Sequence, residues 1–363
     1  MYDSTLLRRF MTTFGPSGYE GEIARLLKTE LEQSADEVFI DNPGNVIARY
    51  KGTNPQSPVI MVYAHMDQLG FIVRKIEADG FIQVDRLGGI PEKVLPGLRV
   101  RMLARSGGYI DGVIGNKSHH ASSPEDKVHV DSVTSLYIDI GASSAEEARS
   151  LGADIGQPVT YTPFSQTLAG GFISGTAIDN RGGLAALAVA ARIIKAEPHE
   201  STVYLVGTVW EEFNVRGAIL AARACRPAIA IGLDVVLAGD TPDLKGRYET
   251  ACGKGPAVVL YNFHGRGTLN GVISHNGLVS LSEKTAEREG IHLQRFASLG
   301  ILTDSAYVQL EGDGPATLEL GFPARYTHSP VETAHIRDIE ELGILIGKTV
   351  GQIDSHFPLH RYT

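Results

Sequence analysis

Residues 59–68 read Val-Ile-Met-Val-Tyr-Ala-His-Met-Asp-Gln, and this stretch decides the fold. Its first six residues form an apolar run without polar alternation, which is typical of a strand buried on both faces of a helix-covered sheet. His65 and Asp67 follow directly, and the ligands of open α/β sheets gather beyond the carboxyl ends of the strands. The stretch therefore predicts an α/β fold with a polar site at the end of a buried strand.

The same α/β pattern recurs before and after this stretch. Residues 202–209 and 228–233 are further apolar strands, and residues 39–48 indicate two short strands around a turn. Ser17 and Glu20 have the spacing of a capping box ahead of a helix. Helices are expected where apolar residues recur at helical spacing or follow a turn: Ile23 to Leu31, Leu184 to Ile194, Val215 to Ala224, Leu278 to Glu289 and Ile336 to Ile353.

The central part of the chain has a different pattern. Asp79-Gly80 and Gly107-Gly108 each separate two short apolar segments, as in β-hairpins. Residues 136–140 and 159–161 indicate further strands, and Ser144 opens a short helix with a capping box. We therefore expect a β-rich module of residues 70–165, inserted into an α/β domain made of residues 1–69 and 166–363.

Composition excludes several classes of protein. The 363 residues are 43% hydrophobic and carry a net charge of −9, which argues against nucleic acid or an anionic membrane as a partner. No apolar run nears the roughly 18–20 residues that span a bilayer. The N-terminus lacks the pattern of a signal peptide, and Cys225 and Cys252 fit free thiols in a reducing compartment, so we expect a cytoplasmic protein.

Two acidic positions near helix or strand ends carry competing interpretations. Asp67 could hold one ring nitrogen of His65 while the other nitrogen binds a metal, or the pair could simply cap a strand. Asp179 lies in Ala-Ile-Asp-Asn-Arg-Gly-Gly (177–183), where an aspartate at a helix start is ordinarily an N-cap.

The adjacent glutamates Glu211 and Glu212 follow the strand of residues 202–209. Ionising two neighbouring carboxylates at a buried strand end is costly, and a metal ion would remove that cost; an acidic helix start is the alternative. Asp234 follows another strand and could be a ligand or a turn residue. His328 lies in a Pro-bounded loop, where a surface histidine is the default.

Taken together, these positions offer two histidines and several carboxylates without cysteine. Such ligands suit zinc, cobalt or manganese rather than a structural thiolate zinc site. This number of ligands could serve two metal ions that share one bridging aspartate. Two ions flanking a water molecule would activate it and polarise a carbonyl, which is the chemistry of amide hydrolysis.

The chain resembles the TET-type dinuclear metallo-aminopeptidases, also called the glutamyl aminopeptidase or cellulase M family of peptidase clan MH. The resemblance spans nearly the whole chain, and its specificity comes from the order and spacing of all motifs together. They are His-x-Asp at 65–67, Asp-Asn-Arg-Gly at 179–182, Glu-Glu at 211–212, Asp234 with Asp240-Thr-Pro, Thr303-Asp304, and Tyr-x-His-Ser-Pro-x-Glu at 326–332.

The resemblance implies two divalent ions per subunit, zinc or cobalt, with manganese as a third candidate. Asp179 would bridge the two ions. Glu212 and His328 would complete one site, and His65 and Asp234 would complete the other. The implied activity is a metal-dependent aminopeptidase that releases N-terminal residues from short peptides with a free N-terminus.

The same resemblance implies roles for two further acids and a fold. Glu211 would be the general base, which takes a proton from the metal-bound water and passes it to the leaving amine, and Asp67 would orient His65. A mixed sheet flanked by helices would form the clan MH catalytic domain, interrupted by the β-rich dimerisation domain. Dimers would assemble further into a tetrahedral homododecamer.

Departures from the family pattern leave every implied ligand in place. Trp210 and Phe213 flank the glutamate pair and leave the shape of the substrate pocket, and hence the residue preference, open.

Another amide hydrolase, such as a deacylase or a different exopeptidase, is an alternative. A glycan hydrolase fits less well, because its two carboxyls usually stand ~5–10 Å apart across the scissile bond. A non-enzymatic assembly protein would not need the ligand set.

Overall fold

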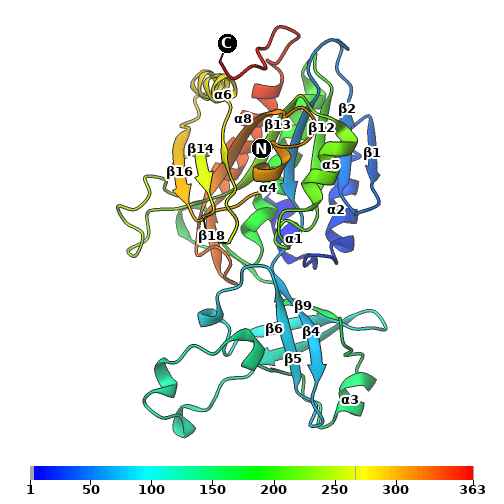
Figure 1. Cartoon of the computed structure of the whole chain (residues 1–363), viewed down its shortest axis with the longest axis vertical. Helices are drawn as coiled ribbons and strands as arrows, with labels where there is room; N and C mark the ends of the chain where they lie inside the picture. The colour runs from blue at the N-terminus through cyan, green and yellow to red at the C-terminus, as the bar shows by residue number, and fades with distance from the viewer. Residues whose placement is uncertain (1–3, 266, 363) are drawn as a thin grey trace.

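The computed structural model describes residues 4–265 and 267–362. Figure 1 shows two parts, a large α/β body and a smaller barrel joined to it by extended segments. The body contains both ends of the chain and the barrel is formed from its middle. Among the described residues, no helix is both long and apolar enough to cross a membrane.

The α/β body is built on one mixed sheet. Strands β12, β3, β13 and β17 lie side by side and run parallel, and antiparallel strands extend the sheet on both sides. The strands of this sheet are β1 (Glu37–Ile40), β2 (Val46–Tyr50), β3 (Ile60–His65), β10 (Ser165–Thr167), β11 (Phe172–Gly175), β12 (Val203–Thr208), β13 (Ile229–Leu237), β14 (Ala257–Phe263), β15 (Gly271–Ile273), β16 (Gln294–Leu299), β17 (Ala316–Arg325) and β18 (Glu332–His335).

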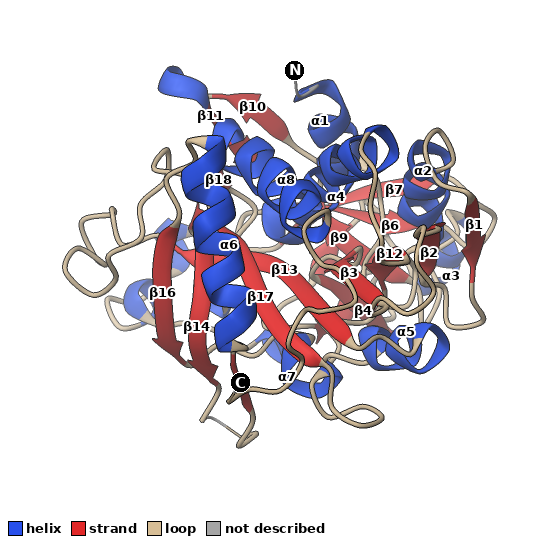
Figure 2. Ribbon diagram, turned by 90° about the horizontal axis from the view of Figure 1, so that it is seen from above, coloured by secondary structure: helices blue, strands red, loops and turns tan. Residues whose placement is uncertain are grey.

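Helices cover both faces of this sheet, as Figure 2 shows for its central strands. Alternate residues of β3 therefore enter different cores: Ile60 and Val62 pack with the larger helix layer, and Met61 and Tyr63 pack under the smaller one. The larger layer consists of α1 (Ser4–Thr12), α2 (Gly21–Leu31), α4 (Ile178–Ala196), α6 (Asn276–Glu289) and α8 (Ile336–Val350), and the smaller one of α5 (Gly217–Cys225) and α7 (Ser305–Val308). This arrangement confirms the predicted helix-covered sheet.

The barrel closes on itself through antiparallel pairs and has its own apolar core. Its first strand follows the body strand β3 after four residues, and β10 returns the chain to the main sheet. The barrel contains β4 (Gly70–Ile76), β5 (Ile82–Leu87), β6 (Arg99–Leu103), β7 (Tyr109–Ile114), β8 (Ile138–Asp139) and β9 (Pro158–Tyr161), the helix α3 (Ala145–Ser150) and the short 3-10 turns η1 (Glu92–Val94), η2 (His119–Ala121), η3 (Asp126–Val128) and η4 (Val133–Ser135). A further 3-10 turn, η5 (Ala169–Gly171), lies in the body.

Two predicted capping boxes have different outcomes. The Ser144 hydroxyl accepts the backbone N–H of Glu147 and caps α3 as expected. The box of Ser17 and Glu20 is wrong: Glu20 itself is the N-cap residue of α2, and the Ser17 hydroxyl donates to the buried carboxylate of Asp67 instead. The Ser17 hydroxyl thus donates to a charged, fully buried carboxylate 50 residues away.

Candidate metal centre

The candidate residues meet at one edge of the parallel sheet. His65 is the last residue of β3, Asp234 lies in the neighbouring β13, and Glu211 and Glu212 follow the end of β12 in a tight loop. Because these strands run parallel, their carboxyl ends bring the side chains to the same side of the sheet. His328 arrives there from the loop between β17 and β18.

Asp179 enters the centre from the start of α4 without capping that helix. The backbone of Asp179 is not helical, and the side chain of the next residue, Asn180, accepts the N–H of Gly183 at the N-cap spacing. The amide nitrogen of Asn180 also donates to the carbonyl oxygen of Leu233 over 2.7 Å. The helix start is therefore satisfied by Asn180, which leaves both carboxylate oxygens of Asp179 free to face the centre.

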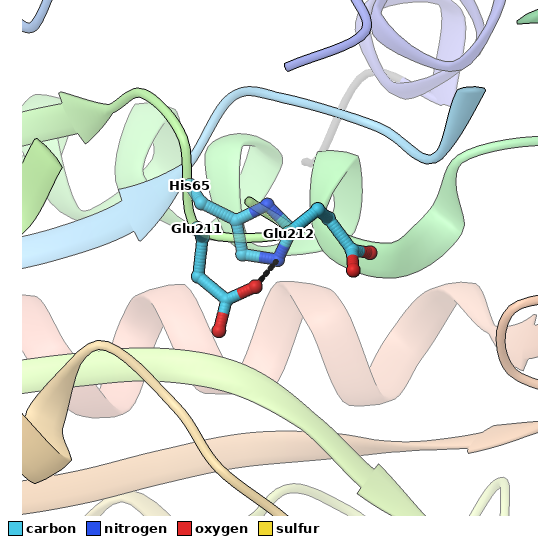
Figure 3. A group of neighbouring side chains, drawn as sticks. All are labelled: His65, Glu211 and Glu212. Atoms are coloured by element: carbon cyan, nitrogen blue, oxygen red, sulfur yellow. Dashed lines mark ion pairs between the residues drawn. The ribbon is translucent and has the colours of Figure 1, made fainter. Parts of the chain in front are cut away.

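One half of the centre surrounds His65. Its Nε2 atom lies 3.2 Å from Oδ1 of Asp179, 3.9 Å from Oδ1 of Asp234 and 3.9 Å from Oε2 of Glu211. Figure 3 shows Glu211 reaching the histidine ring while Glu212 points away from it. His65, Asp179 and Asp234 are buried and close enough to offer three ligands to one ion. We call this set the His65 half-site.

The other half surrounds His328. Its Nε2 atom lies 3.6 Å from Oδ2 of Asp179 and 3.8 Å from Oε1 of Glu212. These three residues again offer one ligand atom each within reach of a single ion, and we call them the His328 half-site. Asp179 thus turns one carboxylate oxygen toward each histidine, which is the geometry that a bridging ligand between two ions requires.

The electrostatics of the site favour bound cations. Burial and the neighbouring acids raise the pKa values of Glu211 and Asp234 well above their usual range and that of Glu212 to about 7. Burial opposes the charge on His328, but Glu212 and Asp179 outweigh it and raise the pKa of His328 to about 9. The Oε1 atom of Glu212 is buried without a hydrogen-bond partner among the described residues. A divalent ion would supply both the missing charge and the missing partner, so this donor set fits metal.

Asp67 lies beneath the glutamate pair and contacts it directly. Its Oδ1 and Oδ2 atoms accept the backbone N–H groups of Glu211 and Glu212, each over 3.0 Å. Toward His65 it is the carbonyl oxygen of Asp67 that lies nearest, 3.0 Å from Nδ1, whereas Oδ1 is 3.5 Å away. Because β3 ends at His65, the strand alternation expected for residues 65 and 67 stops there, and the Asp67 carboxylate turns toward the glutamate loop.

Glu332 is not among the predicted ligands, but it contacts the backbones of two of them. Its buried carboxylate accepts the backbone N–H of Asp179 over 3.0 Å and that of His328 over 2.7 Å. Burial and the nearby Asp179 raise the pKa of Glu332 to about 8. In the sequence, Glu332 was marked only as the last residue of the Tyr-x-His-Ser-Pro-x-Glu motif.

A cavity of about 690 Å³ opens onto both half-sites. Trp210 and Phe213 do not line it; Trp210 packs on the core of the body, and the Phe213 ring lies against the guanidinium of Arg216. Sequence reasoning missed that the barrel contributes to the cavity wall. Besides the candidate ligands and Glu211, the lining is Arg86, Gly89, Ile90 and Pro91 from the barrel and Asn214, Val215, Val235, Leu237, His264, Thr268, Gly300, Ile301, Leu302, Thr303 and Thr327 from the body.

Comparison with known proteins identifies the family of this chain. Residues 44–345 match the family model described as M42 glutamyl aminopeptidase. The chain belongs to this family. It is 38% identical to the putative aminopeptidase SgcX of Escherichia coli K12 over 343 residues, which cover 94% of this chain and 92% of that one. The M42 match confirms the predicted family and establishes the protein as a peptidase of the aminopeptidase type.

Solved structures of similar chains share the whole fold. The aminopeptidase APDkam598 from Desulfurococcus kamchatkensis superposes with a TM-score of 0.91 at 31% identity, covering 97% of this chain and 95% of that one. The TET1 peptidase of Pyrococcus horikoshii, which can assemble into a tetrahedron or a large octahedral shell, gives a TM-score of 0.84 at 30% identity over 96% of this chain and 99% of that one. The M42 fold, body and barrel together, is therefore the fold of this protein.

Proposed function

We propose that this M42 peptidase removes N-terminal residues from short peptides by means of two divalent metal ions. The observation that carries the proposal is Asp179, whose two carboxylate oxygens face two different histidines. His65 and Asp234 would complete one ion's ligands, and Glu212 and His328 the other's. Nitrogen and oxygen donors of this kind suit zinc or cobalt, with manganese as a third candidate.

The bound ions would supply an activated water molecule and polarise the scissile carbonyl. Glu211 would be the general base. It borders the cavity, and neither of the two three-ligand sets that contain Asp179 includes its carboxylate. Its raised pKa, caused first by burial, suits a group that takes a proton from water and returns it to the leaving amine. Asp67 would hold Glu211 and Glu212 in place through their backbones.

The natural substrate class would be short peptides with a free N-terminus, because the M42 family to which the chain belongs consists of aminopeptidases. We also propose that the chain forms homo-oligomers, in which residues 70–165 act as a dimerisation domain and dimers build a tetrahedral dodecamer. The assembly of the similar P. horikoshii peptidase supports this.

The two cysteines are buried and free, which supports a cytoplasmic location.

A comparison of free and blocked substrates tests the activity. Metal-stripped protein is reloaded with zinc or cobalt and given aminoacyl-anilides together with the matching N-acetylated compounds. Release from the free amines alone, dependent on the ions and absent in Glu211→Gln, is the expected result. Hydrolysis of the acetylated series would instead indicate a deacylase or another exopeptidase. Activity in Glu211→Gln would remove this residue from the role of base.

A further inference from the structure

The two candidate histidines are oriented by different parts of the molecule. In each ring the Nδ1 atom faces a backbone carbonyl oxygen: that of Asp67 for His65, over 3.0 Å, and that of Gly89 for His328, over 2.8 Å. Asp67 follows β3 inside the α/β body. Gly89 lies in the barrel, in the loop between β5 and η1, so a barrel residue contacts the His328 half-site directly.

This contact determines which tautomer the neutral His328 ring adopts. A carbonyl oxygen only accepts hydrogen bonds, so Nδ1 of His328 must carry the proton and donate. The lone pair of a neutral ring is then on Nε2, the atom that faces Asp179 and Glu212. An outer partner that sets the tautomer and direction of a ligating histidine typically changes metal affinity by about 10–100-fold.

The barrel loop also packs against this half-site without spare room. A Cβ atom added to Gly89 would lie 3.2 Å from Nδ1 and 3.3 Å from Cε1 of His328. At Gly88 an added Cβ would lie 2.4 Å from a methyl group of Leu69 and 3.3 Å from the Glu212 side chain. Two adjacent glycines therefore let the barrel backbone approach both a histidine and a carboxylate of the same half-site.

We propose that the barrel loop of residues 88–91 is a positioning element for the His328 half-site, so that the affinity for one of the two ions depends on how the barrel docks on the body. The His65 half-site is oriented from within the body and is independent of this loop. The inference rests on the proposed pair of ions, and it gives the inserted barrel a role within each subunit in addition to dimerisation.

Metal titration of glycine variants tests the proposal. Metal-free protein is titrated with Co²⁺, followed by calorimetry and by the cobalt absorption bands, for the wild type, Gly89→Ala and the bulkier Gly89→Val. We expect one of the two affinities to fall by about 10-fold or more and the other to stay within 2-fold, with the valine variant the more affected. Gly21→Ala is the control, because Gly21 also lacks a positive φ and the nearest atom to its added Cβ, 3.5 Å away, is the end of the flexible Arg25 side chain.

Single-histidine backgrounds assign the affected ion. In His65→Ala, where the His328 half-site is the intact one, Gly89→Ala should weaken Co²⁺ binding. In His328→Ala it should leave the remaining affinity unchanged. Equal weakening in both backgrounds, or no change in either Gly89 variant, would overturn the proposal. Circular dichroism and thermal unfolding of each variant show whether the fold is kept.

The outcomes separate this inference from the proposed activity. Wild-type aminopeptidase activity together with unchanged metal affinities in the Gly89 variants would leave the activity standing and remove the barrel's role. The opposite result is also informative. If the Gly89 variants lose affinity for one ion only, but the wild type cleaves none of the anilides, the barrel's role would stand and the proposed substrate class would be wrong.

Discussion

The Oδ1 atom of Asp67 accepts the backbone N–H of Glu211 over 3.0 Å. An aspartate that follows β3 therefore holds the glutamate that follows the neighbouring strand β12. The second oxygen of Asp67 serves Glu212 and also accepts the hydroxyl of Ser17 over 2.6 Å. Burial works against the charge of this carboxylate, but His65 first, and then the Ser17 hydroxyl and the Glu211 N–H, outweigh burial and lower the pKa of Asp67. The loop that carries both glutamates is thereby anchored.

Replacing Asp67 by asparagine should therefore lower kcat by about 100-fold, since misplacement of a catalytic group by about 1 Å costs that much. The amide nitrogen of asparagine donates rather than accepts, so one of the two backbone N–H groups loses its partner. Steady-state kinetics with the best anilide substrate measure the effect, and metal analysis shows whether both ions are retained. Ser17→Ala, which removes one hydrogen bond from the same carboxylate, should cost far less. An unchanged kcat in Asp67→Asn would contradict the anchoring role.

Metal content should distinguish Asp179 from Asp234. If Asp179 bridges the ions, Asp179→Asn weakens both half-sites, and less than one ion per subunit should survive gel filtration. Asp234→Asn should affect only the His65 half-site and retain about one ion. Elemental analysis of the two variants, purified side by side, gives the ratio directly. The bridging assignment is refuted by equal metal content in the two proteins.

The residue pattern was sufficient to predict the elements on which the site is built. The apolar runs before His65, Glu211 and Asp234 have the composition of strands buried on both faces, and these strands form the parallel, helix-covered centre of the mixed sheet. The hairpin signal at Asp79-Gly80 likewise predicted a β-rich insertion. Residue composition works for these elements because each one is marked by residues within its own short stretch of sequence.

Contacts between distant segments could not be predicted in this way. Ser17 had the spacing of a helix cap, but its hydroxyl serves Asp67, 50 residues away. Asp179 had the position of an N-cap, which Asn180 takes instead. The contact of Gly89 with His328 joins residues 239 positions apart in two different parts of the fold. Tertiary packing determines these hydrogen-bond partners, and local sequence patterns contain no information about tertiary packing.

The stability of the metal-free protein should fall as pH rises from about 5 to 9. Folding raises the pKa of Glu212 to about 7 and of Glu332 to about 8, so the folded state binds more protons than the unfolded state above pH 4.5 and loses stability as these protons leave. His328 acts in the same direction, because its raised pKa of about 9 gives stability below pH 6.5 that disappears through pH 9. Thermal unfolding at pH 5, 7 and 9 measures this trend.

The same scan with bound ions provides the control. Divalent ions bind the deprotonated ligands, so the loaded protein should show a smaller decrease and the gap in Tm between loaded and metal-free protein should widen with pH. A metal-free protein that becomes more stable between pH 5 and 9 would contradict the raised pKa values. A constant gap would contradict the assignment of these groups to the metal centre.

Arg181 should be a major determinant of stability, since it is fully buried beneath the site. Its guanidinium donates to the carbonyl of Phe10 and to the side chain of Gln68, over 3.2 and 3.3 Å. Burial lowers the pKa of Arg181 to about 9, while Asp67 and Glu20 favour its charge.

Arg181→Met would remove two buried hydrogen bonds and the positive charge near Asp67 and Glu20, and it should cost about 3 kcal/mol of unfolding free energy. Urea unfolding followed by the fluorescence of Trp210, the single tryptophan, measures the loss. Arg192→Met is the matched control on the same helix: its guanidinium is half exposed and pairs with Glu30, so a change below about 0.5 kcal/mol is expected there. Similar losses in the two variants would show that the buried position of Arg181 has no special energetic role.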